Sequence, residues 1–249
     1  MNTKRMIEFG LVRTACLILT FALLNVFPAK SQHSEKPPKT IEKAGSQHAK
    51  TKGKDGKKLE LLNPLKTGNY NFMKGLPDKH DFKKEREKLV KGQSPSTIII
   101  TCSDSRVPPE IIFDKGLGQI FVIRNAGNVV DSVVLGSAEY AAEHLHSKVL
   151  IVMGHKSCGA IKASLEGETP SPYINSIIAY IKPAVASAKA FHLNEEETVD
   201  VCIEENVKNQ MKNVMKSKII THLIEEGELD IYGAVYDLAT GEVKFLMTK

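Results

Sequence analysis

Two short segments carry the residue types of a metal-dependent enzyme. Residues 102–106 read Cys-Ser-Asp-Ser-Arg, and residues 155–158 read His-Lys-Ser-Cys. Together they supply two thiols and an imidazole, a combination of sulfur and nitrogen ligands that suits zinc. Three protein ligands leave the fourth position of the metal for water, whereas a closed four-ligand site only stabilises a fold. The sequence therefore predicts Cys102, His155 and Cys158 as the ligands of a catalytic zinc ion.

Three short apolar runs must position these ligands. Residues 97–100, 119–123 and 149–153 are rich in apolar and β-branched residues, which is typical of strands buried on both faces of a parallel sheet. Cys102 follows the first run, and His155 follows the third. Because ligands of open α/β sheets bind at the carboxyl ends of the strands, we expect the candidate ligands to meet at that edge.

Helical patterns alternate with these runs, and this alternation predicts an α/β fold. We expect a central, mainly parallel sheet of about four parallel strands plus an antiparallel C-terminal edge strand, flanked by helices. The edge strand belongs to a predicted hairpin, in which residues 230–238 and 242–246 flank a turn. The predicted helical regions are residues 60–74, 78–91, 132–146, 171–192 and 195–224.

The first 31 residues have the pattern of a secretory signal peptide. A basic start precedes an apolar run from 14 to 27, and Ala29 and Ser31 supply small residues where signal peptidase cleaves. Because the run is short for a membrane span, we expect cleavage, export to the periplasm and no stable membrane insertion. The alternative is an uncleaved N-terminal membrane anchor.

The remaining chain divides into a linker and one domain. Residues 32–58 contain many Lys, Gly, Pro and Ser residues and few large apolar ones, so we predict a flexible linker before a domain at 59–249. The net charge is +5, and residues 1–31, with four basic residues and one acidic residue, contribute +3 of it. Because no basic cluster with interleaved aromatics occurs in the domain sequence, we predict no nucleic-acid partner. Cys202 lies on the apolar face of a helical pattern and is interpreted as a small buried hydrophobe.

Several motifs closely resemble those of the β-class carbonic anhydrases, and the resemblance extends over residues 60–247. The longest matching motifs are Cys-Ser-Asp-Ser-Arg-Val at 102–107, Arg-Asn-Ala-Gly-Asn at 124–128, Glu-Tyr-Ala at 139–141 and Gly-His-x-x-Cys-Gly-Ala at 154–160. Shorter matches lie at 68–72, 205–207 and 233–237.

The resemblance implies the reversible hydration of carbon dioxide to bicarbonate and a proton by zinc-bound hydroxide. Zinc lowers the pKa of bound water toward about 7, which provides this nucleophile at neutral pH. The resemblance implies that Asp104 accepts the hydrogen bond of the hydroxide and that Arg106 binds Asp104 in a fork geometry. In the family this pair acts as a gate, and Asp104 becomes the fourth zinc ligand when the pair breaks. The alternative is an ordinary salt bridge at a strand end.

A second set of residues matches the substrate pocket of the plant-like variant of the family. The resemblance implies that Gln93 donates a hydrogen bond to substrate or bicarbonate, that Phe121 and Tyr140 line an apolar pocket, and that the Gly159 N–H binds the same oxygens. The other variant has a tryptophan in a non-catalytic bicarbonate site. Ile99 stands at that position and the chain contains no tryptophan, so we expect no such site.

The resemblance also implies an assembly. Members of the family form homodimers or higher even homo-oligomers by exchanging N-terminal helices, so Gln93 and Phe121 are expected to face the zinc site of a neighbouring subunit. Two alternative functions remain: a hydrolase of carbonyl sulfide or carbon disulfide on the same zinc site, and a non-catalytic zinc-binding protein. Hydration also requires a proton acceptor. The sequence does not select one among His80, His144, His146, His192 and His222.

Overall fold

A computed structural model describes residues 54–167 and 169–246, with side chains from Glu60 onward. The predicted signal peptide and most of the predicted linker lie outside this range. Within it, the strands form one sheet in the order β2-β1-β3-β4-β5. The first four strands in this order are parallel and β5 runs antiparallel to β4, which confirms the predicted α/β architecture. The strands are β1 (Thr97–Cys102), β2 (Ile120–Asn125), β3 (Val149–His155), β4 (Asp230–Tyr236) and β5 (Val243–Leu246).

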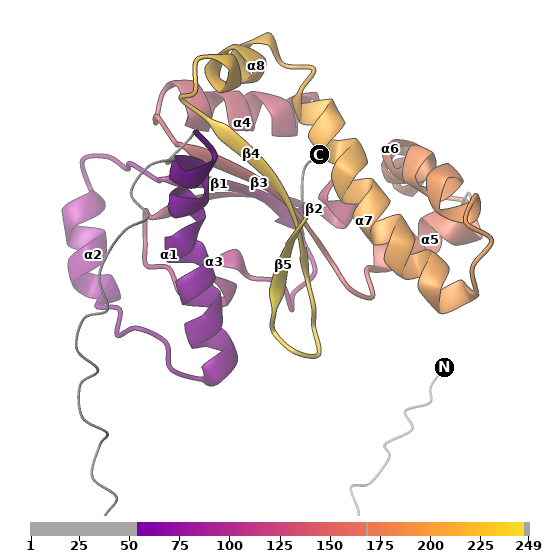
Figure 1. Cartoon of the computed structure of the whole chain (residues 1–249), viewed down its shortest axis with the longest axis horizontal. Coiled ribbons are helices and arrows are strands. Elements are labelled where there is room, and N and C mark those ends of the chain that lie inside the picture. Colours follow the sequence, from indigo (N-terminus) through magenta and orange to yellow (C-terminus); the bar gives the residue numbers. More distant parts are fainter. Residues whose placement is uncertain (1–53, 168, 247–249) are drawn as a thin grey trace, which may run out of the picture. The chain divides into compact units, whose positions relative to one another are not determined.

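Helices cover both faces of this sheet (Figure 1). Every residue of β1 is buried, and its side chains point alternately into two apolar cores. Ile98 and Ile100 belong to the core that also contains side chains of the helices between residues 132 and 225. Ile99 belongs to the opposite core, together with Leu62 and Phe113. This burial on both faces explains why β1 is a continuous apolar run.

Short polar side chains fix the beginnings of most of the longer helices. The side chains of Asp131, Ser171, Asn194 and Ser217 each accept a hydrogen bond from a backbone N–H of the first helical turn. The helices are α1 (Lys54–Lys74), α2 (Phe82–Leu89), α3 (Pro109–Ile112), α4 (Ser132–Glu143), α5 (Gly159–Glu166), α6 (Pro172–Lys189), α7 (Glu195–Val214) and α8 (Lys218–Glu225), with a short 3-10 turn η1 at Ala126–Asn128.

The first two helices differ from the predicted boundaries. α1 begins at Lys54, inside the stretch 32–58 that was predicted as a linker. Extension of a formed helix is favourable because each added residue contributes one hydrogen bond, which explains the earlier start. The region 78–91 contains only the shorter α2, whose start is fixed by the Asp81 side chain.

The predicted helical region 195–224 is two helices rather than one. The first ends after Val214, and the Ser217 side chain then accepts a hydrogen bond from the Ile220 N–H and begins α8. A serine that caps a helix competes with continuation of the preceding one. The short helices α3 and α5 were not predicted, and both lie close in sequence to the candidate ligands.

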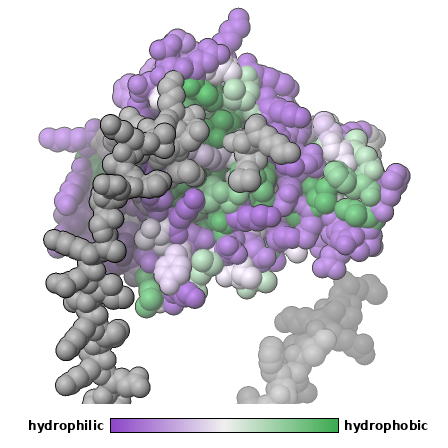
Figure 2. Space-filling view, viewed as in Figure 1, coloured by the Kyte–Doolittle hydropathy of each residue, from purple (hydrophilic) through white to green (hydrophobic). Residues whose placement is uncertain are grey.

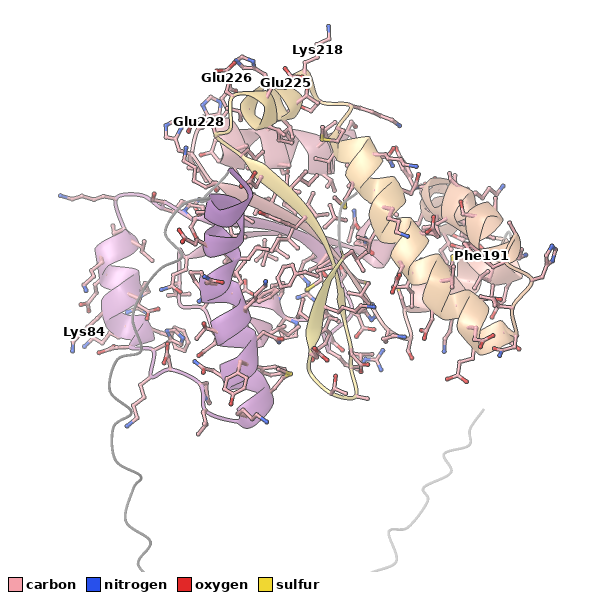
Figure 3. All side chains as sticks on the ribbon, in the orientation of Figure 1. Lys84, Phe191, Lys218, Glu225, Glu226 and Glu228 are labelled. Carbon is pink, nitrogen blue, oxygen red and sulfur yellow. The ribbon has the colours of Figure 1, made fainter. Side chains whose placement is uncertain are left out.

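The visible surface is mainly hydrophilic, with apolar residues exposed in separate places (Figure 2). One such place lies around α5 and α6 (Figure 2). Among the aromatic residues in and after α6, Tyr173 and Phe191 are largely exposed. Figure 3 labels Phe191, which follows α6, and the charged residues Lys218, Glu225 and Glu226 at the ends of α8. No helix in the described part of the chain is long and apolar enough to cross a membrane.

Candidate metal centre

Three segments bring the predicted ligands to the carboxyl edge of the sheet. Cys102 is the last residue of β1, His155 is the last residue of β3, and Cys158 directly precedes α5. All three residues are buried, and their ligand atoms lie within 4.8 Å of one another. One ion could therefore bind all three side chains at once.

The His155 ring presents Nε2 to this cluster. Its Nδ1 atom lies 2.9 Å from the backbone carbonyl oxygen of Lys156. Because a carbonyl oxygen only accepts, Nδ1 carries the proton and Nε2 keeps its lone pair. Nε2 is buried and has no hydrogen-bond partner among the described residues. An unpaired buried nitrogen is costly, and a metal ion would satisfy it.

The two thiols form a coupled pair that suits a divalent cation. The hydrogen bond from the Cys158 thiol lowers the pKa of Cys102 to about 4, and the Gly127 N–H acts in the same direction. The Gly127 nitrogen lies 3.4 Å from Cys102 Sγ. The hydrogen bond to the Cys102 thiolate, followed by burial, raises the pKa of Cys158. A dication would allow both thiols to ionise, so the donor set fits zinc.

Arg106 holds the carboxylate of Asp104 beside this cluster. The Arg106 Nε and Nη2 atoms donate to Asp104 Oδ1 and Oδ2 at 2.9 Å and 2.8 Å, and the Arg106 backbone N–H donates to Oδ1 at 3.0 Å. These bonds hold the pKa of Asp104 well below its usual range. Asp104 Oδ2 lies 3.9 Å from His155 Nε2, so an ionised carboxylate faces the ligand atoms.

A second arginine, to which the sequence analysis gave no role, holds the same loop. Arg124 Nε donates to the carbonyl oxygen of Cys102 at 3.1 Å, and Nη2 donates to the carbonyl oxygen of Asp104 at 2.7 Å. The feature that reveals this role is the strand register, which pairs Asn125 with Cys102 and so places Arg124 next to the loop. The Arg-Asn-Ala-Gly-Asn motif alone did not reveal this contact.

Gly159 lies at the N-terminus of α5, directly after Cys158. The first N–H groups of a helix have no partner within the helix and favour anions. A Cβ atom at Gly159 would meet no atom within 4 Å. The structure therefore leaves open space beside this residue.

The other predicted pocket residues lie away from the ligands within one chain. Phe121 pairs with Ile98, four register positions from the pair of Cys102 and Asn125, and at about 3.3 Å per residue this separation is about 13 Å. The rings of Phe121 and Tyr140 lie 6.3 Å apart. Gln93 is exposed and precedes β1, so the whole of that strand separates it from Cys102.

Two of the five candidate histidines have informative contacts. The His144 ring lies 5.4 Å from the Tyr140 ring, which places it beside a predicted pocket residue. His80 lies between two carboxylates, at 3.3 Å from Glu85 and 3.5 Å from Asp114, and so connects α2 to the segment after α3. These contacts favour a role near the pocket for His144 and a structural role for His80.

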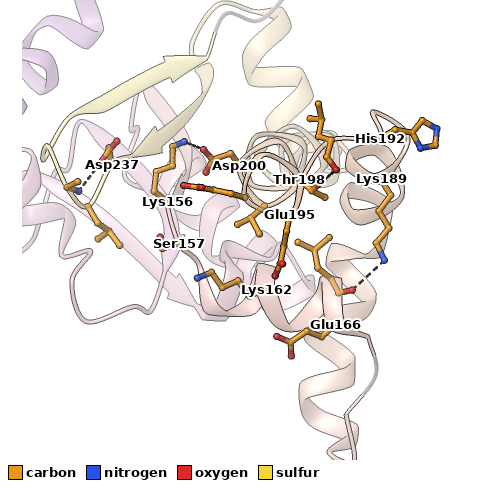
Figure 4. Close-up of a pocket in the computed structure, with 16 residues that line it drawn as sticks. Lys156, Ser157, Lys162, Glu166, Lys189, His192, Glu195, Thr198, Asp200 and Asp237 are labelled. Atoms are coloured by element: carbon orange, nitrogen blue, oxygen red, sulfur yellow. Dashed lines mark hydrogen bonds and ion pairs between the residues drawn. The ribbon is translucent and has the colours of Figure 1, made fainter.

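A cavity of about 1100 Å³ lies beside the ligand loop but does not include the three ligands. Lys156 and Ser157 form one wall, and Lys156 makes an ion pair with Asp200 on α7 (Figure 4). Lysines and carboxylates both line the rest of the cavity, so its charge favours neither anions nor cations. We therefore place the site at the Cys–His–Cys cluster.

Comparisons with known proteins agree with this geometry. The sequence profile of the family described as "Carbonic anhydrase" matches residues 97–243. Carbonic anhydrase 2 of Mycobacterium tuberculosis is 39% identical over 183 residues, which are 71% of this chain and 87% of that protein. The structure of a Coccomyxa β-carbonic anhydrase in complex with acetazolamide has 32% identity and a TM-score of 0.61, over 75% of this chain and 86% of that one. A tetrameric β-carbonic anhydrase of Sordaria macrospora has 29% identity and a TM-score of 0.62, over 66% and 86%.

Proposed function

The chain belongs to the β-class carbonic anhydrase family, and we propose that it catalyses the zinc-dependent, reversible hydration of carbon dioxide to bicarbonate and a proton. The observation that carries this proposal is a buried Cys–His–Cys cluster with an unpaired imidazole nitrogen beside a carboxylate held by an arginine. Cys102, His155 and Cys158 would hold the zinc ion. When bound, zinc supplies a Lewis acid that makes water a nucleophile at neutral pH.

Asp104 orients the attacking water in this proposal. Its carboxylate stays ionised at neutral pH, because hydrogen bonds from Arg106 hold its pKa well below the usual range. An ionised carboxylate only accepts hydrogen bonds, so Asp104 fixes the direction of a water O–H and hence the direction of its lone pairs. The bonds to Arg106 keep the carboxylate in place beside the ligands instead of among them. This arrangement supports an active, open site.

The Gly159 N–H and the N-terminus of α5 bind the product in this proposal. The N–H can donate to an oxygen of bicarbonate, and the partial positive charge of the helix N-terminus favours the anion. The absence of a side chain leaves room for that oxygen. Any side chain at position 159 would occupy this space.

The test is stopped-flow measurement of carbon dioxide hydration on the full chain with known zinc content. We expect turnover that follows the bound zinc and is lost when a chelator removes the metal. Negligible zinc-dependent hydration at neutral and alkaline pH would contradict the proposal. Hydrolysis of carbonyl sulfide or carbon disulfide by the same preparation would then identify the alternative substrate class.

Asp104→Asn separates an enzyme from a non-catalytic zinc protein. The amide keeps the size of the side chain but loses an ionised acceptor, so turnover should fall by about 10²-fold with zinc content unchanged. Glu110→Gln, at an exposed position on α3, is the matched control and should leave turnover unchanged. Equal activity of the two variants would remove Asp104 from the mechanism.

We further propose that the active pocket is completed by a second copy of the chain. Gln93, Phe121 and Tyr140 match pocket residues of the family but lie away from the ligands of their own chain. A homodimer, or a higher even oligomer, would place them at a neighbour's metal site. The Sordaria structure is described as tetrameric, which supports an oligomer here without fixing its size.

For localisation we propose export to the periplasm after cleavage near Ser31. The support is the charged start, apolar run and small residues of the first 31 positions. N-terminal sequencing of the exported protein tests this proposal. A start near Gln32 is expected, and an intact Met1 would indicate an anchored protein instead.

A further inference from the structure

We propose that Asn206 and Gln210 on α7 are positioning residues for the metal ligand Cys102. They hold the loop 126–130 so that the Gly127 N–H donates to the Cys102 sulfur. This inference rests on the proposed metal site and adds two residues whose hydrogen bonds reach the ligands only through the loop. Its basis is a continuous chain of hydrogen bonds from α6 to the ligand, which is buried from Gln210 onward.

The first step of that chain joins α7 to the loop. Asn206 is 1% exposed, and its Nδ2 atom donates to the Gly127 carbonyl oxygen at 3.0 Å and to Asn128 Oδ1 at 3.4 Å. The Gly127 N–H in turn points to Cys102 Sγ at 3.4 Å. The amide of one side chain therefore holds the residue whose backbone donates to the ligand sulfur.

The second step fixes Asn206 itself. Gln210 is completely buried one helical turn later, and its Nε2 atom donates to Asn206 Oδ1 at 2.9 Å and to the Tyr180 carbonyl oxygen at 3.1 Å. Gln210 Oε1 accepts the Val130 N–H at 2.9 Å. Gln210 thus holds both the orientation of the Asn206 amide and the far end of the loop, and it connects them to α6.

The loop needs such support because its backbone is unusual. Gly127 and Asn128 have φ angles of 72° and 46°, both in the left-handed region. A Cβ at position 127 would lie 2.9 Å from Ile181 Cδ1 and 3.0 Å from Ala160 Cβ, so only glycine fits. A left-handed asparagine persists where the surroundings hold it, and here the surroundings are the two α7 amides.

The N–H contact matters for the chemistry of the sulfur. Two thiolates donate more charge to a metal than neutral imidazoles do, and a hydrogen bond to a ligand sulfur withdraws part of that charge. The N–H also fixes the direction in which the sulfur presents its lone pairs. Partners of this kind typically change metal affinity by about 10-fold to 100-fold when they are removed.

The test compares two asparagines of the same helix. Asn206→Leu removes the donor to Gly127 while keeping the size of the side chain. Asn209→Leu is the matched control, because the half-buried Asn209 donates to the same Tyr180 carbonyl oxygen, at 2.9 Å, but has no bond to the loop. Asn206→Ser, whose side chain is too short to reach Gly127, is measured in parallel in case the leucine variant does not fold.

Two readouts besides activity are used: the sulfur-to-cobalt charge-transfer band of the Co²⁺-substituted protein, and the exchange rate of the Gly127 amide in the Zn²⁺ protein. We expect each Asn206 variant that folds to shift the band, to bind Co²⁺ about 10-fold more weakly and to exchange the Gly127 amide about 10-fold faster. Asn209→Leu should match the wild type.

Three results would overturn the inference. Unchanged spectra and exchange in the Asn206 variants would show that the amide does not hold the Gly127 N–H. Equal changes in the Asn209 variant would indicate a general effect on α7. Failure of both Asn206 variants to fold, with Asn209→Leu folded, would assign Asn206 to stability alone. A wild-type protein without the thiolate band would instead contradict the metal site itself, which distinguishes failure of the proposed function.

Discussion

The two ends of β1 differ in how completely one chain builds them. At the carboxyl end, Cys102 is buried, its sulfur accepts the Gly127 N–H, and its carbonyl oxygen accepts from Arg124. At the amino end, Gln93 is exposed, and Tyr140, whose ring lies beside Phe121 near the start of β2, is 48% exposed. The first end is enclosed by its own chain, whereas the second presents predicted pocket residues on the surface.

The proposed function explains why the two ends of β1 differ. A metal site requires ligand atoms held to a few tenths of an ångström, which buried strand ends and hydrogen-bonded loops provide. A pocket for a small apolar substrate needs mainly apolar walls, and these walls can come from a second chain. We therefore expect changes at the carboxyl end to act within one subunit and changes at the amino end to act on the neighbour.

The largest expected effect comes from removing a ligand at the enclosed end. Cys158→Ser replaces a soft thiolate by a hydroxyl that does not ionise at neutral pH, so zinc should be lost and hydration should fall by more than about 10⁴-fold. Zinc content by atomic spectroscopy and stopped-flow hydration check this prediction. Cys202→Ser, at another buried cysteine, is the control and should retain both zinc and activity. Full zinc content in Cys158→Ser would contradict the assignment of the metal site to the carboxyl end of β1.

Much of the enclosed end could be predicted from the sequence. The apolar run 97–100 predicts a doubly covered strand, and the order of strands and helices then sends Cys102 and His155 to one edge. The ligands are recognisable because sulfur and imidazole at this spacing are uncommon outside metal sites. The network behind them is not recognisable, because Asn206 and Gly127 are 79 positions apart in sequence and the pairing depends on how α7 packs.

The predicted boundaries were less accurate where a single polar residue decides them. The break between α7 and α8 depends on the Ser217 cap, which a pattern of apolar residues does not register. The short helix α5 was missed because eight residues carry too few apolar positions to define a period. Both the cap and α5 depend on local hydrogen bonds more than on hydrophobic patterning.

At the exposed, amino end of β1 we expect an intermediate effect. The experiment tests whether Gln93 lines the pocket of its own subunit or that of the neighbouring subunit. Loss of one hydrogen bond to substrate in Gln93→Ala should reduce kcat/KM by about 10-fold with zinc unchanged. In the proposed homodimer, co-expression of this variant with Cys158→Ser would form mixed dimers by random assembly. If Gln93 serves the neighbour, the zinc-loaded chain of each mixed dimer receives a normal glutamine. The activity of an equal mixture should then be about a quarter of the wild-type activity. If Gln93 lines the pocket of its own chain instead, the mixture should have about a twentieth of the wild-type activity.

Two controls make the mixing result decisive. Each variant alone must be measured at the same total concentration, and mass spectrometry of the native complex must show the mixed species. Activity that equals the mean of the separate variants, despite mixed dimers, would place Gln93 in the pocket of its own chain. That result would break the proposed division between the two ends of β1.

The smallest expected effect concerns the exit of the proton at the exposed end. His144 has an exposed side chain, and its ring lies 5.4 Å from the Tyr140 ring, so it can pass a proton from the pocket to solvent. His144→Ala should lower kcat a few-fold in dilute buffer while kcat/KM stays unchanged, because proton transfer follows the conversion of carbon dioxide. Concentrated imidazole buffer should restore kcat, since it replaces the missing base. His192→Ala, which removes a ring outside the contacts of Tyr140, is the control. A fall in kcat/KM that imidazole does not restore would mean that His144 shapes the substrate pocket, and the exposed end would then be a binding surface alone.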